Sequence, residues 1–206
     1  MDRLGEPPMV DRHQMDERAR RDPRIGPAID RSLIDRARNG DLDAFESIVR
    51  ARMDAVYRLT AAILGDEADA RDAAQETFVA AWREIRRLRE AERLDAWLQR
   101  IAVNAARQTL RSRGRRRVHE IPSSLIASVP DPVSAASTAP SDAAILDAAL
   151  ARLPVDQRAI LVLHHLEGRP LADLAAILDV PIGTAKSRLF AARRALAAEI
   201  RAEESR

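Results

Sequence analysis

The stretch that decides the fold runs from Arg169 to Leu196 and reads RPLADLAAILDVPIGTAKSRLFAARRAL. Its first part predicts a short helix, whose apolar positions are Leu171, Leu174, Ile177 and Leu178. Its second part predicts another helix, whose apolar positions are Ala185, Leu189, Ala192 and Leu196. The residues from Asp179 to Gly183 separate the two with a tight turn. A short helix, a tight turn and a second helix form the helix-turn-helix pattern typical of DNA-binding domains.

The second helix of this pattern has a face that suits the major groove of DNA. At about 100° per residue, the apolar stripe leaves four residues pointing outward and three on its flanks. The outward residues are Ser187, Phe190, Ala191 and Arg194, and the flanking residues are Lys186, Arg188 and Arg193. No acidic residue lies between Pro181 and Arg194. Arg and Lys bind guanine edges and phosphates, and an exposed ring can contact a thymine methyl group. The alternative is a structural helical hairpin with a solvated basic face and a buried Phe190.

The chain upstream of this domain is also helical in pattern. Residues 32–113 carry three apolar stripes at steps of three and four residues, which predict a small helical bundle. The first stripe comprises Phe45, Ile48, Val49, Val56, Leu59 and Ile63. The second comprises Ala74, Phe78, Ala81, Ile85 and Leu88. The third comprises Leu94, Trp97, Leu98, Ile101 and Ala105. The predicted fold class is therefore all-α, with two small helical domains.

Composition places the boundaries of these domains. Residues 1–31 hold four prolines and too few apolar residues for a core, so we predict a disordered arm. Residues 114–141 are rich in Pro, Ser, Ala and Asp without sustained periodicity, which predicts a flexible linker. The second helical domain then occupies residues 142–206. An extended linker of this length would let the two domains sit far apart on one partner.

The composition of the 206 residues also limits the classes of function. There is no cysteine, and no apolar run is long enough for a membrane span, so we expect a cytoplasmic protein without membrane insertion. His164 and His165 are adjacent and therefore point to different sides of a helix. Neither has a nearby partner at the spacing that metal ligands require. The sequence has no phosphate-binding loop and no HExxH motif. We expect no metal, no cofactor, no small-molecule substrate and no enzymatic activity.

Three motifs resemble the sigma factors of bacterial RNA polymerase. DARDAAQETFVAAW, from Asp69 to Trp82, resembles region 2.2, which binds core polymerase. LDAWLQRIAVNAARQTLRSR, from Leu94 to Arg113, resembles the segment that reads the −10 element. PIGTAKSRLFAARRAL resembles the region 4 helix that reads the −35 element. The motifs follow the order of the family, and with regions 1.1 and 3 absent they resemble the extracytoplasmic-function (ECF) group, which implies region 2 at residues 32–113 and region 4 at residues 142–206.

The resemblance implies a docking surface for core polymerase. Polar residues recur at steps of three and four residues beside the apolar stripe and form a net acidic strip, which suits a basic partner. In the family this strip binds the clamp helices of the β′ subunit, and the partner implied in core polymerase also includes the β subunit. The residues assigned to core binding are Asp69, Asp72, Gln75, Glu76 and Phe78, the last as support. The alternative is an ordinary solvated helix face.

A basic segment follows the acidic strip. From Arg83 to Arg117 there are 12 arginines and four acids, a net charge of +8 that suits phosphates. The alternative is a charged helix end that frays into solvent. In the family, flipped bases of the −10 element bind beside the loop before the Trp97 helix, here about Leu88 to Arg93. This loop has no aromatic residue for stacking, so we expect stringent promoter choice. The −10 residues assigned by resemblance are Arg93, Trp97, Arg100, Asn104, Arg107 and Arg111.

The resemblance assigns the −35 element to the last helix, with departures from the family pattern. The assigned residues are Thr184, Lys186, Ser187, Arg188, Phe190, Arg193 and Arg194. Gln108 stands where many members have Asp, and Ala191 stands where many have Arg, which weakens any transfer of promoter sequence. Asp179 replaces a frequent Gly in the turn, but Asp tolerates a left-handed backbone.

The expected partners are core RNA polymerase, promoter DNA and an anti-sigma factor, the last implied by resemblance alone. Two alternatives make different predictions about the chain. A regulator with an upstream receiver domain requires alternating strands and helices, which residues 1–140 do not show. A helical adaptor that binds only protein would not need a helix whose exposed face is basic and free of acidic residues, as it is between Pro181 and Arg194.

Overall fold

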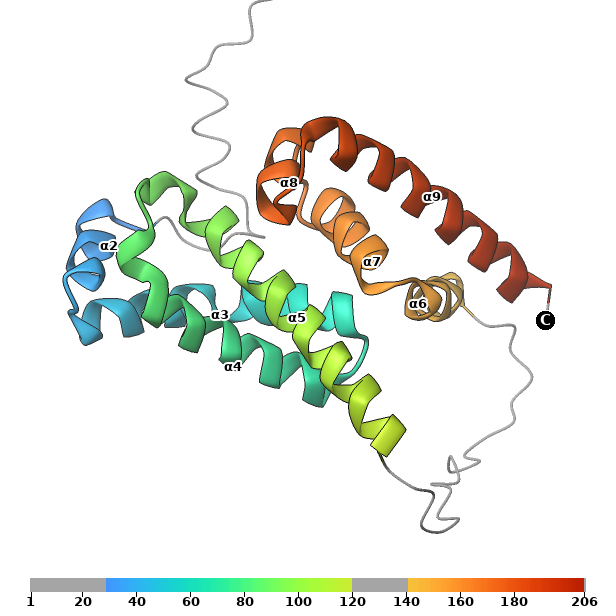
Figure 1. Ribbon diagram of the computed structural model, residues 1–206, viewed down its shortest axis with the longest axis horizontal. Coiled ribbons are helices and arrows are strands. Elements are labelled where there is room, and N and C mark those ends of the chain that lie inside the picture. The colour runs from blue at the N-terminus through green and yellow to red at the C-terminus, as the bar shows by residue number, and fades with distance from the viewer. Residues whose placement is uncertain (1–28, 120–140, 206) are drawn as a thin grey trace, which may run out of the picture.

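The computed structural model describes residues 29–119 and 141–205, and within these ranges every regular element is a helix or a helical turn (Figure 1). The prediction of an all-α protein is confirmed. The N-terminal unit contains α2 (Arg31–Arg38), α3 (Leu42–Leu64), α4 (Glu67–Glu84), the 3₁₀ turns η1 (Ile85–Arg87) and η2 (Ala91–Arg93), and α5 (Leu94–His119). The C-terminal unit contains α6 (Asp142–Arg152), α7 (Val155–Leu161), the π-helical turn η3 (Val162–Leu166), α8 (Leu171–Leu178) and α9 (Ile182–Glu204).

Helix ends in the N-terminal unit are fixed by short polar residues and one glycine. Asp41 begins α3 by accepting a hydrogen bond from the Ala44 amide at 3.0 Å. Gly65 ends the same helix with φ +69°, the left-handed conformation that glycine adopts without strain. Asp66 then caps α4 by accepting from the Asp69 amide at 2.9 Å. The sharp reversal between α3 and α4 therefore follows from three local residues.

The N-terminal core forms where the three apolar stripes meet. Ile48, Leu59 and Ile63 of α3 are fully buried. The rings of Phe45 and Trp82 lie 4.9 Å apart and link α3 to the end of α4. Burial of these side chains is the main term that stabilises a bundle of this size.

The C-terminal unit has the predicted helix-turn-helix. Leu174 and Ile177 of α8 are buried with Ala185 and Leu189 of α9. Asp179 lies between the two helices with φ +54°, the left-handed conformation that the sequence analysis expected Asp to tolerate there. Local sequence is sufficient to specify this motif.

Helix α5 is longer than the sequence pattern predicted. The linker was placed from Gly114 onward, but the helix continues to His119. A single helical glycine costs only about 1 kcal/mol, and arginines, which favour helix, follow Gly114 directly. The rest of the proposed linker, and nearly all of the proposed N-terminal arm, lie outside the described residues.

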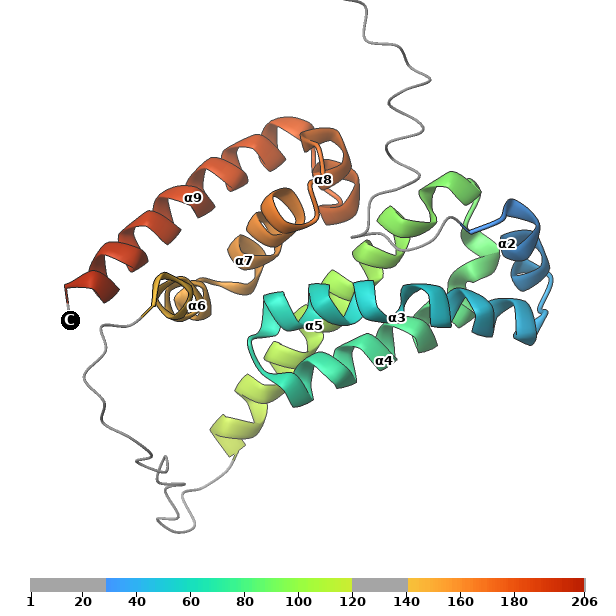
Figure 2. The same cartoon turned by 180° about the vertical axis from the view of Figure 1, so that it is seen from behind.

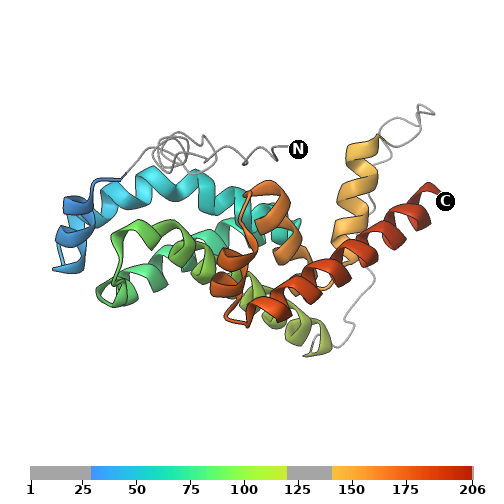
Figure 3. The ribbon, with the colours of Figure 1, turned by 90° about the horizontal axis from the view of Figure 1, so that it is seen from above.

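The two units pack against each other. Helices α7 and α8 lie against α5, and α7 also contacts α3. Figures 1 and 2 show the C-terminal unit beside α5 and the end of α3, with α9 on its outer side. The view from above in Figure 3 shows the same arrangement, with α2 at the end remote from the C-terminal unit. This closed arrangement was not predicted from the sequence.

The buried core of the C-terminal unit gives a first testable prediction. Ile160 is 0% exposed, and Ile160→Ala is expected to lower the free energy of unfolding by about 2–5 kcal/mol, because it removes buried methyl groups and leaves a cavity. Urea unfolding followed by circular dichroism measures the change. Ile182→Ala is the matched control, because Ile182 is 55% exposed in the same unit and its truncation should change stability by less than about 1 kcal/mol. Equal effects of the two variants would contradict this core.

Candidate functional site

The acidic strip on α4 faces solvent. Asp72, Gln75 and Glu76 are exposed. Asp69 is half-buried, and its carboxylate binds the Arg113 guanidinium of α5 at 2.7 Å. Three of the four polar residues are therefore free to meet a partner, while Asp69 also ties α4 to α5.

Phe78 does not belong to this exposed surface. Its side chain is only 6% exposed and lies in the core of the bundle. The helical period explains this, because Phe78 follows Ala74 by four residues on the apolar face of α4. It packs beneath the strip, in the supporting position that the sequence analysis gave it.

A groove of about 760 Å³ runs between α4 and α5. One wall carries the carboxylates of Asp69, Asp72 and Glu76, and the other carries Arg100 and Asn104. Residues that the sequence assigned to polymerase and residues that it assigned to DNA thus border one groove. Its two walls differ in charge, so an acidic ligand and a basic ligand would favour opposite sides.

The residues assigned to the −10 element lie in η2 and at successive positions along α5. Arg93, Trp97 and Arg100 line a pocket of about 210 Å³ whose other wall includes Ala176 and Ile177 of α8. Arg93 also forms an ion pair with Glu90 at 2.6 Å within the preceding loop.

The other assigned residues of α5 are not gathered in this pocket. Asn104 and Arg111 are exposed. Arg107 donates to the Asn104 side chain at 3.0 Å and to Asp156 of α7 at 2.7 Å. The structure therefore divides the predicted −10 residues into a pocket and a polar stretch further along the helix.

The first half of α9 presents the predicted reading face. Phe190 is 64% exposed, which excludes the buried alternative for its ring. The guanidinium of Arg194 lies 6.0 Å from the centre of that ring, at the limit of a cation–π contact. Lys186, Ser187 and Arg188 are exposed beside it, and Thr184 is half-buried.

Arg193 differs from its neighbours on this helix. Its Nε donates to His165 Nε2 at 3.2 Å, which connects α9 to η3. Burial, and then the neighbouring His164 and Arg193, lower the pKa of His165. The imidazole is therefore neutral near pH 7 and can accept this hydrogen bond. Arg193 has a structural partner that sequence alone did not indicate.

Several polar residues form contacts between the two units that could not be recognised from the sequence. Gln99 of α5 bonds Glu167 and Arg169, which follow η3. Arg158 of α7 donates to the carbonyl of Ile63 in α3 at 2.6 Å. These partners are 68 to 95 residues apart in the chain, so no local spacing could reveal them.

Among the described residues, no group of His, Asp and Glu side chains is arranged to hold a metal ion. None of the helices in the described ranges is long and apolar enough to cross a membrane.

Comparison with known proteins identifies the two helical units. The family model "Sigma-70 region 2" matches residues 48–116, and "Sigma-70, region 4" matches residues 143–196. The chain is 31% identical over 185 residues to the RNA polymerase sigma-H factor of Pseudomonas aeruginosa, which covers 81% of this chain and 91% of that one. It is 31% identical over 174 residues to the ECF RNA polymerase sigma-E factor of Haemophilus influenzae, covering 80% and 91%.

Two solved structures are similar over both units. One is the sigma factor RpoE in complex with the anti-sigma factor NepR from Bartonella quintana, with a TM-score of 0.59, 28% identity, and coverage of 78% of this chain and 98% of that one. The other is CnrH in complex with the cytosolic domain of CnrY, with a TM-score of 0.60, 26% identity, and coverage of 84% and 97%. The sequence matches and the shared fold lead to one conclusion: this chain belongs to the ECF group of RNA polymerase sigma factors, within the sigma-70 family.

Proposed function

We propose that this chain binds core RNA polymerase and directs it to open DNA and start transcription at a specific set of promoters. The observation that carries the proposal is the presence of sigma-70 region 2 and region 4 in one chain, in that order, with exposed faces suited to protein and to DNA. We assign region 2 to residues 32–113 and region 4 to residues 142–206. Helix α5 extends six residues beyond residue 113, to His119, and we place the start of the linker after that residue.

Core polymerase docks on the exposed strip of α4. Asp72 and Glu76 are four residues apart on one exposed helix face, and no residue of the described ranges holds either carboxylate in a hydrogen bond or ion pair. Gln75 adds a neutral donor and acceptor between them. A basic surface such as that of the clamp helices would pair with this strip, and such a contact weakens at high salt.

The −10 element binds along α5 and the loop before it. The pocket that would take an unstacked base is bordered by Arg93, Trp97 and Arg100. Further along α5, the rest of the opened DNA strand would contact Asn104, Arg107 and Arg111. Trp97 offers a stacking surface at the pocket wall, although the loop itself has none. Capture of few bases by polar groups fits a factor with stringent promoter choice.

The −35 element binds to the first half of α9 in the major groove. Lys186, Arg188 and Arg194 supply charge for phosphates and guanines, and Phe190 can contact a thymine methyl group. Thr184 and Ser187 supply hydroxyls for the DNA backbone, although the Ser187 hydroxyl also donates to the Thr184 carbonyl at 3.0 Å. Arg193 contributes less to DNA binding, because its guanidinium also donates a hydrogen bond to His165.

An anti-sigma factor is the expected regulator. One similar solved structure is the sigma factor RpoE bound to the anti-sigma factor NepR. The polymerase supplies the chemistry of RNA synthesis, so this chain acts as a non-enzymatic, cytoplasmic specificity subunit without a cofactor.

Gel filtration of the purified chain with sigma-free core polymerase tests the proposal. Co-elution in a single complex is expected, together with protection of a promoter fragment that core polymerase alone does not protect. A chain that did not bind core polymerase but bound duplex DNA by itself would instead be a conventional helix-turn-helix regulator.

A further inference from the structure

The small pocket between the loop before α5, the first turns of α5 and helix α8 is strongly basic. Its volume is about 210 Å³. Its charged lining residues are Arg87, Arg89, Arg93, Arg100 and Glu90. Four guanidinium groups against one carboxylate give the lining a net charge of +3. A concave site with this charge attracts anions.

Most of this positive charge has no partner within the described part of the chain. Arg93 pairs with Glu90 at 2.6 Å. None of the described residues holds the guanidinium of Arg87, Arg89 or Arg100 in a hydrogen bond or ion pair. A guanidinium group is a planar fork of donors that matches the oxygens of a phosphate group. Three such groups at one pocket favour a ligand that carries phosphates.

The same pocket offers apolar surface to an aromatic ring. Trp97 of α5 is half-buried, Ile177 of α8 is buried, and both line the pocket. The pocket is smaller than the roughly 300–1,000 Å³ of most small-molecule sites. It can therefore hold one base, while the phosphates lie outside it against the exposed side chains of Arg87 and Arg89.

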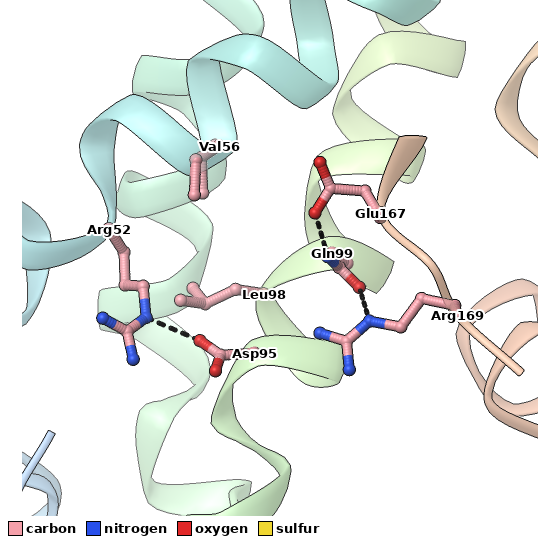
Figure 4. Close-up of a pocket in the computed structure, with 8 residues that line it drawn as sticks. Arg52, Val56, Asp95, Leu98, Gln99, Glu167 and Arg169 are labelled. Atoms are coloured by element: carbon pink, nitrogen blue, oxygen red, sulfur yellow. Dashed lines mark hydrogen bonds and ion pairs between the residues drawn. The ribbon is translucent and has the colours of Figure 1, made fainter. Parts of the chain in front are cut away.

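Polar contacts fix the wall that α8 supplies. The Gln99 amide of α5 donates through Nε2 to Glu167 at 3.1 Å and accepts through Oε1 from Arg169 Nε at 2.8 Å, as Figure 4 shows. Arg169 in turn pairs with Asp173 of α8 at 3.7 Å. These contacts hold α8 beside α5, so that residues of both helices border one pocket.

We propose that this pocket binds a free purine nucleoside di- or triphosphate, with the base stacked on Trp97 and the phosphates held by Arg87, Arg89 and Arg100. The ligand is a single small molecule that contacts both helical units and is bound without being converted. This site goes beyond the proposed function, which concerns only polymerase and DNA.

The lining also predicts which nucleotides bind. Stacking on an aromatic side chain accepts any base, and a purine presents the larger face. Among the lining residues that the structure describes, none has a side-chain amide or hydroxyl to distinguish one purine from the other. We therefore expect ATP and GTP to bind with similar affinity, and affinity to fall as phosphates are removed.

Tryptophan fluorescence reports directly on the proposed stacking. The chain has two tryptophans, and Trp82→Phe leaves Trp97 as the only one while keeping a ring beside Phe45. We expect GTP to quench Trp97 with a dissociation constant below about 1 mM, because stacking and charged hydrogen bonds act together. Equilibrium dialysis of labelled GTP against the unaltered chain measures the same affinity without the substitution.

Fragments of the ligand separate the two halves of the site. Guanosine has the base without phosphates, and inorganic pyrophosphate has phosphates without a base. Each is expected to compete with labelled GTP at least roughly tenfold more weakly than unlabelled GTP does, because each fills only part of the site.

Two exposed alanines provide a matched pair of variants. Ala176 lines the pocket, whereas Ala198 lies in the second half of α9. Ala176→Glu brings a carboxylate to the arginines and is expected to weaken GTP binding at least roughly tenfold. Ala198→Glu makes the same change of charge away from the pocket and should alter the affinity by less than about twofold.

Two exposed arginines provide a second pair. Arg89→Ala removes a proposed phosphate contact, so GTP binding should weaken roughly tenfold. Arg201→Ala removes the same charge from the last turn of α9 and should have less than about a twofold effect.

Three results would overturn the nucleotide site. The first is no binding of GTP by the unaltered chain at about 1 mM. The second is equal affinity for GTP in Ala176→Glu and Ala198→Glu. The third is pyrophosphate that competes as well as GTP, because the base would then play no part. Polymerase and DNA are absent from these measurements, so a failure here is distinct from a failure of the proposed sigma function, which co-elution with core polymerase tests.

Discussion

Replacing Asp72 and Glu76 together with arginine is expected to abolish stable binding to core RNA polymerase. Both carboxylates are exposed on one face of α4, and the double change converts two negative charges into two positive ones at the proposed contact. Like charges placed across an interface cost several kcal/mol, so we expect the dissociation constant to rise by at least roughly a hundredfold. Co-elution with core polymerase and a fluorescence titration measure the loss.

The fold should survive this change, because neither side chain is buried. Thermal unfolding of the variant is expected to match that of the wild-type chain within a few degrees. The control is Asp43→Arg with Asp54→Arg, which reverses two exposed acids on α3 and gives the same total change in charge. If both double variants bound core polymerase as the wild type does, docking on the α4 strip would be wrong.

Replacing Arg188 and Arg194 together with glutamate is expected to remove recognition of the −35 duplex. Both side chains are exposed on the first half of α9, and negative charge there would repel the DNA backbone. We expect at least roughly a hundredfold weaker binding of the reconstituted polymerase to a promoter, with a smaller dependence of affinity on salt. Binding of the variant to core polymerase without DNA should not change.

A residue at the opposite end of the same helix supplies the comparison. Arg201 is exposed, but it lies beyond the face assigned to the major groove. Arg201→Glu is therefore expected to alter promoter affinity by less than threefold. Equal losses from Arg201→Glu and from the double variant would mean that overall charge, and not the reading face, governs binding.

Local features of the fold could be predicted from the sequence. The three-residue spacing of Leu174 and Ile177 indicates the buried face of the first helix of the helix-turn-helix. Asp179, which tolerates a left-handed backbone, marks the turn that follows. The apolar stripe of α3 likewise predicts which side chains are buried, as Ile48 and Ile63 show. These features depend on neighbours three or four residues apart, which a single sequence displays.

Features that depend on distant partners could not be predicted. Nothing near Gln99 in the sequence indicates Glu167 or Arg169, and Arg158 gains its role only because the Ile63 carbonyl lies beside it. Phe78 was assigned to core binding only as support for the strip, and its place in the apolar stripe predicted the burial that the structure shows. A motif gives residue identities, and only the packing of the helices shows which of them reach the surface.

Transcription by reconstituted polymerase tests the sigma assignment most directly. Sigma-free core polymerase is mixed with the chain and with sheared genomic DNA from the source organism, and the 5′ ends of the transcripts are mapped. The account predicts a small set of start sites that appear only when the chain is present, each preceded by the same pair of sequence elements near −10 and −35. Transcripts that do not depend on the chain, or start sites with no shared upstream elements, would contradict it.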